Sequence, residues 1–326
     1  MGVHTWVLNR GIDPVYEDDT ALAGWADRLA HPPPSIEVPV DIALPETLTG
    51  RPLREGLPLP VDRSLHVEDP ESPGDAAEGD RFALVATTSD LLLTVSKRTV
   101  RFEGREVLPV PADPTRGFDA NYKHSEADYK LREGAVAPLA YARERAWTLR
   151  RKLGQLESRE NLLVMADRDL PCRLLAEIFF TAGALYFIPH LVGGRAGRVV
   201  DLGLSEQNPL DWLVRVAVLP QTFELALPHE RGVIECERGR VDERDGARFI
   251  TIARRDDGYD FEALSDCARR VEKAFSHKLV YGVAPAPAVS VQVLVSTIDA
   301  LRKDAARDVE IGLDLSLFLM AALPGN

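Results

Sequence analysis

The sequence predicts an α+β fold in which one structural unit occurs twice. From Phe82 onward, short β-rich runs alternate with stretches whose apolar residues recur at helical spacing. The second half of the chain repeats the element order of the first half. Segments 161–185 and 280–304, which lie 119 residues apart, align without a gap and match in their apolar positions. This self-similarity indicates an internal duplication of a unit of about 110 residues.

Residues 1–80, which precede the first unit, have a different composition. A short helix is expected within 19–30, where Asp19 or Thr20 provides an N-cap. Residues 31–73 contain ten of the chain's 23 prolines, and proline fixes φ and removes a backbone donor. We therefore expect an extended, Pro-rich arm. The alternation of apolar and polar residues in 36–47 predicts that part of the arm adds a strand to a sheet edge.

The first unit is expected to span 81–204, and apolar spacing defines its elements. In order, they are strands at 82–88, 91–97 and 99–110, a helix at 139–156, a strand at 161–167, a helix from Pro171 and a strand at 185–192. The third run contains a Glu-Gly turn at 103–104. The stripe of the first helix consists of Leu139, Ala142, Ala146, Leu149, Leu153 and Leu156.

The second unit is expected to span 205–326. Its elements are strand-like runs at 212–219, 223–228, 233–239 and 247–255, a helix at 259–275, a strand at 278–284, a helix at 289–302 and a strand at 309–315. Asp260 precedes the first of these helices in N-cap position. A turn is expected at Asp245–Gly246.

Composition excludes several classes of function. A net charge of -12 argues against binding to nucleic acid or to an anionic membrane surface. The chain has no run of 18 apolar residues and no apolar signal segment, so it is expected to be soluble as given. Histidines never fall at helical ligand spacing, and neither a metal nor a cofactor is predicted.

The three cysteines, Cys172, Cys236 and Cys267, are widely spaced. Their spacing excludes a disulfide-rich scaffold and a C-x-x-C site. Three buried thiols are expected, because free cysteine behaves as a small hydrophobe, and one disulfide is the alternative.

The repeated residues resemble the periplasmic domain of the ExbD/TolR family. "VSVQVLVSTIDALR" (289–302) is similar to the family's "xLVxxMDALR" helix, with Ile298 where Met is usual. Segment 165–185 resembles the turn and second helix of that domain, and 254–275 resembles the preceding helix. "VDIALPET" (40–47) resembles the segment that follows the family's membrane helix.

The resemblance implies two tandem domains, each a small mixed sheet with two helices on one face. It also implies a periplasmic protein of a Gram-negative bacterium that engages protein partners of a proton-driven motor, stator or transport complex, or peptidoglycan. The duplication would supply an internal pseudo-dimer, with a homodimer as the alternative. The family's membrane helix has no counterpart here, so contact with the membrane is expected only through a segment absent from this chain. If residue 1 is the native start, a cytoplasmic adaptor is the expectation instead.

Five residues are candidates for a partner surface. Asp167, Arg168 and Asp169 follow a strand, where loops often carry function. An enzyme site there is the minority hypothesis, because the second repeat has "APAP" at the equivalent position; capping of the next helix and pairing of the two acids with Arg168 are favoured. Asp299 and Arg302 lie three residues apart on one helix, on a solvated face or a partner surface.

Two further motifs carry weaker signals. "GGRAGR" (193–198) lacks the Lys-Ser/Thr of a phosphate-binding loop. A local basic face is expected from Arg150, Arg151, Lys152 and Arg159. The sequence therefore predicts a non-enzymatic binding or scaffolding protein.

Overall fold

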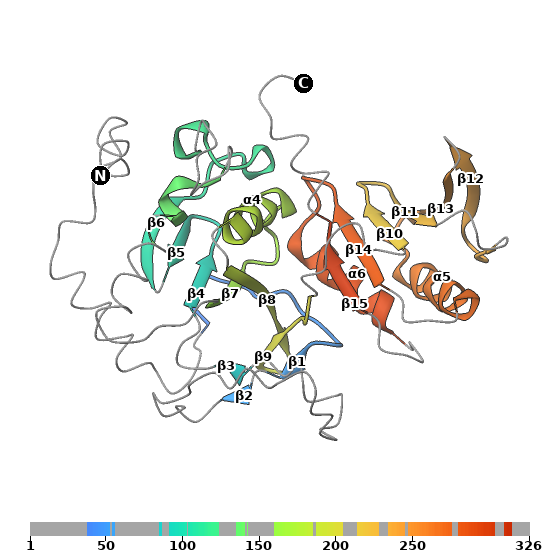
Figure 1. Ribbon diagram of the computed structural model, residues 1–326, viewed down its shortest axis with the longest axis horizontal. Helices are drawn as coiled ribbons and strands as arrows, with labels where there is room; N and C mark the ends of the chain where they lie inside the picture. Colours follow the sequence, from blue (N-terminus) through green and yellow to red (C-terminus); the bar gives the residue numbers. More distant parts are fainter. Residues whose placement is uncertain are drawn as a thin grey trace, which may run out of the picture.

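The chain is α+β, as the sequence predicts, and contains two mixed sheets (Figure 1). The computed structural model describes residues 38–52, 54–55, 85–86, 91–102, 104–123, 135–140, 142, 160–184, 187–204, 214–227, 234–244, 247–275, 280–303 and 310–314. The predicted helix at 19–30, the basic residues Arg150, Arg151, Lys152 and Arg159, and the turn at 245–246 lie outside these ranges.

The first sheet has seven strands within the described residues. Their order across the sheet is β1 (Arg51–Pro52), β9 (Arg198–Asp201), β8 (Phe187–Arg195), β7 (Glu160–Ala166), β4 (Leu91–Val95), β5 (Thr99–Phe102) and β6 (Arg105–Pro109). The helix α4 (Cys172–Ala184) follows β7, and backbone at 137–140 and 142 is also helical. The short helices η2 (Pro114–Arg116) and η3 (Ala120–Tyr122) and a parallel pair, β2 (Arg54–Glu55) with β3 (Val85–Ala86), belong to the same half.

The second sheet has six strands within the described residues. Their order is β12 (Arg240–Arg244), β13 (Ala247–Ala253), β11 (Thr222–Leu227), β10 (Val214–Val218), β14 (Val280–Pro285) and β15 (Glu310–Leu313). The helices α5 (Phe261–Ala274) and α6 (Val291–Arg302) contact each other in this half. Asp260 caps α5 by accepting a hydrogen bond from the Ala263 N–H, as its N-cap position predicts.

The two sheets share a core of five strands with the same order and directions. β8-β7-β4-β5-β6 corresponds to β15-β14-β10-β11-β13. In both sets the first three strands run parallel to one another, and the last three pair antiparallel. Because β4 and β10 lie centrally, their inward side chains are fully buried; those of β10 are Val214, Val216 and Val218. Apolar contacts continue from one half to the other and form one core cluster.

The observed elements differ from the predictions at several points, and β12 is one strand that was not predicted. The run at 233–239 is not a strand; its described part ends in a turn in which the Gly239 N–H donates to the Cys236 carbonyl. β8 continues to Arg195 and turns back into β9, which the sequence did not predict. Ala196 and Gly197 have φ of 50° and 77°, the positive values that a tight two-residue hairpin turn requires.

The halves meet where the turns that precede α4 and α6 lie side by side. The Cys172 N–H donates to the Val289 carbonyl at 2.7 Å, and the Val291 N–H donates to the Leu170 carbonyl at 2.8 Å. The repeat offset of 119 residues exchanges these two bonds. A second pair joins Arg173 N to Pro287 O at 3.1 Å and Gln292 N to Arg168 O at 2.9 Å, and the same offset exchanges them.

This contact has the self-complementary character of a two-fold dimer interface, here within one chain. Figure 1 shows the first half to the left of the second, with α4, β14 and α6 near the junction. None of the helices in the described part of the chain is long and apolar enough to cross a membrane.

Candidate functional site

Within the Pro-rich segment, residues 38–50 bind at the junction of the two halves, and from here on "the arm" means these residues only. The Asp299 carboxylate on α6 receives four hydrogen bonds from this segment. Its Oδ1 accepts from the Thr47 hydroxyl at 2.7 Å, the Thr49 N–H at 3.1 Å and the Thr49 hydroxyl at 2.5 Å; its Oδ2 accepts from the Leu48 N–H at 2.8 Å. Asp299 is 7% exposed and Thr47 4% exposed, so water competes little with these charge-assisted bonds.

The next contact clamps the main chain of Glu46. The Gln292 side chain, two turns before Asp299 on α6, accepts from Glu46 N at 2.8 Å through Oε1 and donates to Glu46 O at 2.9 Å through Nε2. A primary amide thus satisfies both backbone groups of one arm residue, as a neighbouring strand would. The exposed Glu46 side chain contributes only a 3.5 Å contact with Arg168.

The glycine pair at the end of β8 admits the arm backbone. Glu46 forms a parallel bridge with Gly194, whose N–H donates to the Pro45 carbonyl at 2.8 Å and whose carbonyl accepts from Thr47 N at 3.0 Å. A Cβ at position 193 would lie 2.9 Å from that Pro45 oxygen, closer than real Cβ atoms approach. "GGRAGR" therefore serves close backbone approach and a hairpin turn in this structure.

The predicted acids after β7 hold the beginning of the arm. Asp167, 2% exposed, accepts from Ala43 N at 3.0 Å through Oδ2, and Arg168 N donates to Ala43 O at 2.7 Å. Oδ1 of Asp167 accepts from the Asp169 N–H at 3.1 Å and thereby closes the turn. Asp169 itself pairs with Lys97 at 2.5 Å, which lowers the pKa of Asp169 and raises that of Lys97.

One more ion pair and two carbonyl contacts complete the surroundings. Arg101 on β5 makes two hydrogen bonds to Asp41, at 3.0 and 2.8 Å, and they hold the pKa of Asp41 below its usual value. Arg302 donates to the carbonyls of Leu202 and Gly203, so the end of α6 contacts the segment after β9. After the arm, β1 pairs antiparallel with β9.

A small apolar cluster lies beneath the arm on the face of the first sheet opposite α4. Leu163, Met165 and Val192 are at most 2% exposed, and Val38 and Leu44 of the arm pack on this cluster. In the second repeat, positions 282 and 284, which correspond to 163 and 165, hold Gly282 and Ala284. The apolar side chains that receive the arm are therefore particular to the first repeat.

All five candidate residues thus contact segments of their own chain. Asp299 lies buried, so its interpretation as part of a solvated face is wrong: the arm covers it. The expected pairing of the two acids with Arg168 is replaced by Lys97 at Asp169 and by the Ala43 N–H at Asp167. Arg168 contacts Glu46 instead.

Sequence reasoning missed Thr47, Thr49, Gln292 and the glycines 193–194. The two threonines are two residues apart, a spacing that would place both on one side of an extended segment; this spacing was the available signal. The predicted added strand at 36–47 is a single bridge at Glu46, and the strand pairing comes later, at β1.

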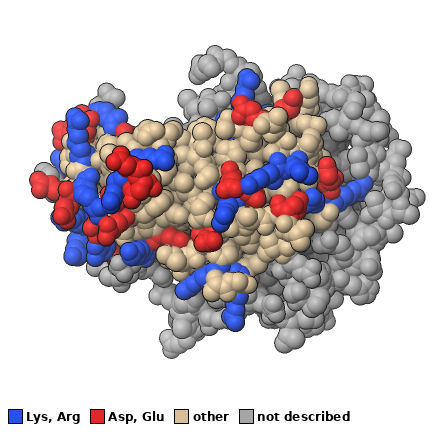
Figure 2. Space-filling model, turned by 180° about the vertical axis from the view of Figure 1, so that it is seen from behind, with Lys and Arg blue, Asp and Glu red and all other residues tan. Residues whose placement is uncertain are grey.

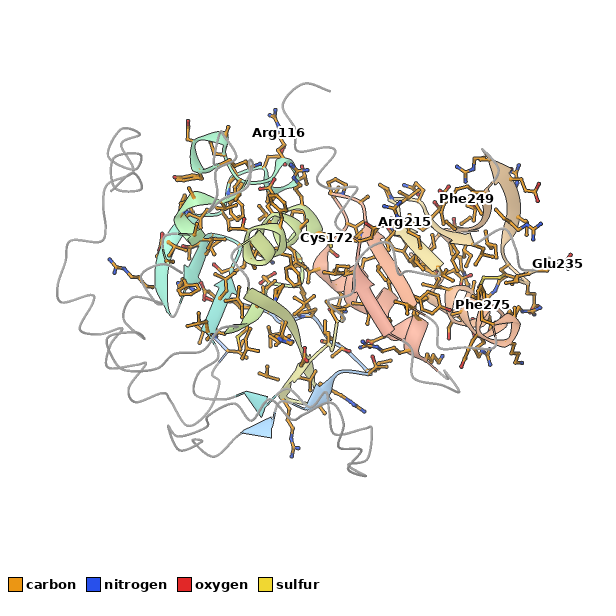
Figure 3. The ribbon with its side chains drawn as sticks, viewed as in Figure 1. Arg116, Cys172, Arg215, Glu235, Phe249 and Phe275 are labelled. Carbon is orange, nitrogen blue, oxygen red and sulfur yellow. A yellow bond between two sulfur atoms is a disulfide. The ribbon has the colours of Figure 1, made fainter. Side chains whose placement is uncertain are left out.

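The expectation of three free thiols is also wrong. Cys236 and Cys267 form a disulfide with 5.0 Å between their Cα atoms, which ties the turn at 236–239 to α5. Cys172 is free and buried at the start of α4, near the second half (Figure 3). Its burial raises the pKa of the thiol far above the ordinary value.

Other features of the described residues offer little for ligand chemistry. A cavity of about 10 Å³ beneath α4 is lined by Leu93, Phe102, Leu139, Leu162, Ile178, Thr181 and Ala182, and it has room for about one water molecule. Within the described ranges, no three His, Cys, Asp or Glu residues are grouped to hold a metal ion. Charged side chains of both signs gather at one end in Figure 2, which corresponds to the end formed by β12 and β13 in Figure 1. Arg244 on β12 pairs with Glu224 on β11, and Arg248 on β13 pairs with Glu243 on β12.

Comparison of the chain with protein-family models, with curated proteins and with solved structures finds no match.

Proposed function

We propose that this chain is a non-enzymatic binding and scaffolding protein of the bacterial envelope, of the kind formed by the periplasmic part of ExbD/TolR-type complexes. The observation that carries the proposal is the duplicated architecture: the two sheets share an equivalent five-strand core, and the two halves meet through a two-fold-like contact at the starts of α4 and α6. Such a construction holds partner surfaces in a fixed relation. The partners we assign are proteins of a proton-driven complex or peptidoglycan.

The disulfide supports an extracytoplasmic location. Disulfides persist in oxidising compartments such as the periplasm and are rare in the reducing cytosol. Cys236 lies in the turn before β12 and Cys267 lies on α5, and their bond links positions 31 residues apart in the chain. A chain kept in the cytoplasm would lose the stabilisation that this bond provides.

The geometry around 167–169 supports binding over catalysis. Asp167 is occupied by two backbone N–H groups, and Asp169 is paired with an exposed lysine. A general acid or base has to reach a substrate proton directly. These acids hold backbone instead, and the role we propose for them is structural.

Thiol trapping in intact cells tests the location. Cells are lysed in denaturant with a mass-tagged maleimide, with and without prior reduction. One tag, on Cys172, is expected without reduction and three tags after it. Three tags without reduction would favour the cytoplasmic adaptor. The variant Cys236→Ala/Cys267→Ala serves as the control and is expected to take one tag under both conditions.

Co-sedimentation tests the partner. Purified full-length chain is mixed with isolated peptidoglycan sacculi, and the pelleted fraction is compared with that of a reference protein of similar charge. Pelleting that saturates with added chain supports peptidoglycan as the partner. Equal pelleting of both proteins would contradict it and leave protein partners, which crosslinking in cells followed by mass spectrometry identifies.

A further inference from the structure

We propose that the surface formed by Asp167, Arg168, Gly194, Gln292 and Asp299, called the arm site, is a recognition site for a peptide segment with hydroxyl residues at alternate positions. Residues 43–49 are its occupant in cis. In trans, the occupant is a segment of a partner protein with the same pattern. This inference rests on the proposed binding function and specifies the ligand.

The first argument is the chemistry of Asp299. Burying a carboxylate is costly unless hydrogen bonds replace its water. The corresponding position of the first repeat, 119 residues earlier, is Phe180 on α4, so the repeated fold does not need an acid there. The bonds that compensate the burial of Asp299 and that the structure shows come from Thr47, Leu48 and Thr49. We therefore assign Asp299 to binding of the arm.

Gln292 supports the same conclusion. Its counterpart in the first repeat is Arg173, which pairs with Glu177 on its own helix at 2.8 Å. Gln292 instead grips the N–H and the carbonyl of Glu46. The two corresponding positions therefore have different partners: Arg173 contacts its own helix, whereas Gln292 contacts the backbone of the arm.

The second argument concerns which features of a bound peptide the site recognises. The contacts at 43, 45, 46 and 48 involve main-chain atoms, whereas at 47 and 49 they include side-chain hydroxyls. The Leu48 residue is 74% exposed, and the Glu46 side chain is 82% exposed. The site therefore selects two hydroxyls separated by one residue and tolerates many side chains at positions 46 and 48.

The third argument is preorganisation. Pro45 fixes its own φ and disfavours helical backbone at Leu44, so this part of the arm is restricted before it binds. A segment already restricted loses less conformational entropy when it docks, so a free peptide of this kind can bind through few contacts. A tethered arm competes with it at an effective concentration on the order of millimolar.

The test uses a fluorescent peptide of residues 42–51 and the full-length chain. In the variant Thr47→Val/Thr49→Val, the arm loses both hydroxyls while keeping its shape. We expect this variant to bind the peptide at least tenfold more tightly than the unaltered chain does. Adding Asp299→Asn is expected to abolish the gain. Hydrogen exchange at Leu48 reports whether the arm has been released.

Matched peptides give the specificity. A peptide carrying Thr47→Val and Thr49→Val is expected not to bind, and one carrying Leu48→Ala is expected to bind as the parent peptide does. If the double variant is misfolded by circular dichroism, the single variant Thr49→Val replaces it.

Three outcomes would overturn the proposal. The first is an arm that exchanges freely while the peptide fails to bind. The second is binding that is indifferent to Asp299→Asn. The third is a dimer of the unaltered chain that Thr47→Val/Thr49→Val dissociates, because the occupant would then be the arm of a second copy. None of these results depends on cell location, so failure here is distinct from failure of the envelope role.

Discussion

Pro171 and Ser290 occupy the same position in the two repeats, and they pair with each other in an antiparallel β-bridge. A residue that meets its own counterpart lies on a two-fold axis, as in a symmetric dimer. Around this pair, each backbone bond has a partner bond of the same kind. The duplication thus gives one chain an interface that two chains normally have to assemble.

Removing either of two equivalent hydrogen bonds at this axis should have similar effects. Val291 is the first residue of α6, and proline there leaves the helix intact but removes the N–H that donates to Leu170. Val291→Pro and Cys172→Pro should each lower the free energy of unfolding by about 0.5–1.5 kcal/mol. Urea denaturation measures both. A large loss for one with none for the other would contradict the equivalence of the two bonds.

The Asp299 carboxylate should stabilise the whole junction. In Asp299→Asn, the amide nitrogen cannot accept hydrogen bonds, so part of the arm contact is lost. Hydrogen bonds to charged groups contribute about 1.5–3 kcal/mol each, and we expect a loss in that range. Hydrogen exchange should speed up at Leu48 and Thr49. The control Lys303→Ala, at an exposed position just after α6, should leave both amides protected.

The disulfide should contribute strongly to stability. Cys236 and Cys267 are separated by 31 residues, and closing a loop of that size in the unfolded chain corresponds to about 3–4 kcal/mol. Cys236→Ala/Cys267→Ala should lower the free energy of unfolding by this amount. Reductant should destabilise the unaltered chain similarly and leave the double variant unchanged. Equal stability with and without reductant in the unaltered chain would contradict the bond.

The remaining thiol should be inert in the folded chain. Burial raises the pKa of Cys172, so the reactive thiolate is absent at neutral and mildly alkaline pH. Without reductant, Ellman's reagent should detect no thiol in the native chain up to pH 9 and one in denaturant. A thiol that reacts quickly in the native state would show that the start of α4 opens.

Acid should loosen the arm and the turn beside it. Asp41 and Asp169 have lowered pKa values because of Arg101 and Lys97, respectively. Their contribution is therefore fully present above the ordinary value of 3.8 and is lost as pH falls below it. Between pH 4.5 and 2, stability should fall less steeply in Asp41→Asn/Asp169→Asn than in the unaltered chain. Parallel pH profiles would contradict the assignment.

The regular elements could be predicted because their signals are local. The apolar stripe that includes Leu264, Ala268 and Val271, all buried, predicts α5 and its inward face, and Asp260 marks its start. The matching offset of two segments revealed the repeat. In both cases a few neighbouring residues determine the structure.

The arm site and the disulfide depend on pairings that no local pattern encodes. Thr47 and Asp299 are 252 residues apart in the chain, and nothing near either residue identifies the other. The residues around Cys236 have the composition of a strand, but the disulfide to Cys267 and the turn at Gly239 hold them in a non-strand conformation. In such segments, tertiary contacts override the conformation that the local sequence prefers.

The order of contacts along the arm determines how a pulling force would enter the molecule. Tension applied ahead of residue 38 first loads Asp41 on Arg101 and Ala43 on Asp167, both in the first half. It then reaches Glu46 and Thr47, which are held by Gln292 and Asp299 in the second half. At 45–47 the arm is also bonded to Gly194 of the first sheet, so both halves hold it there. Displacing the arm completely would therefore require breaking contacts in both halves.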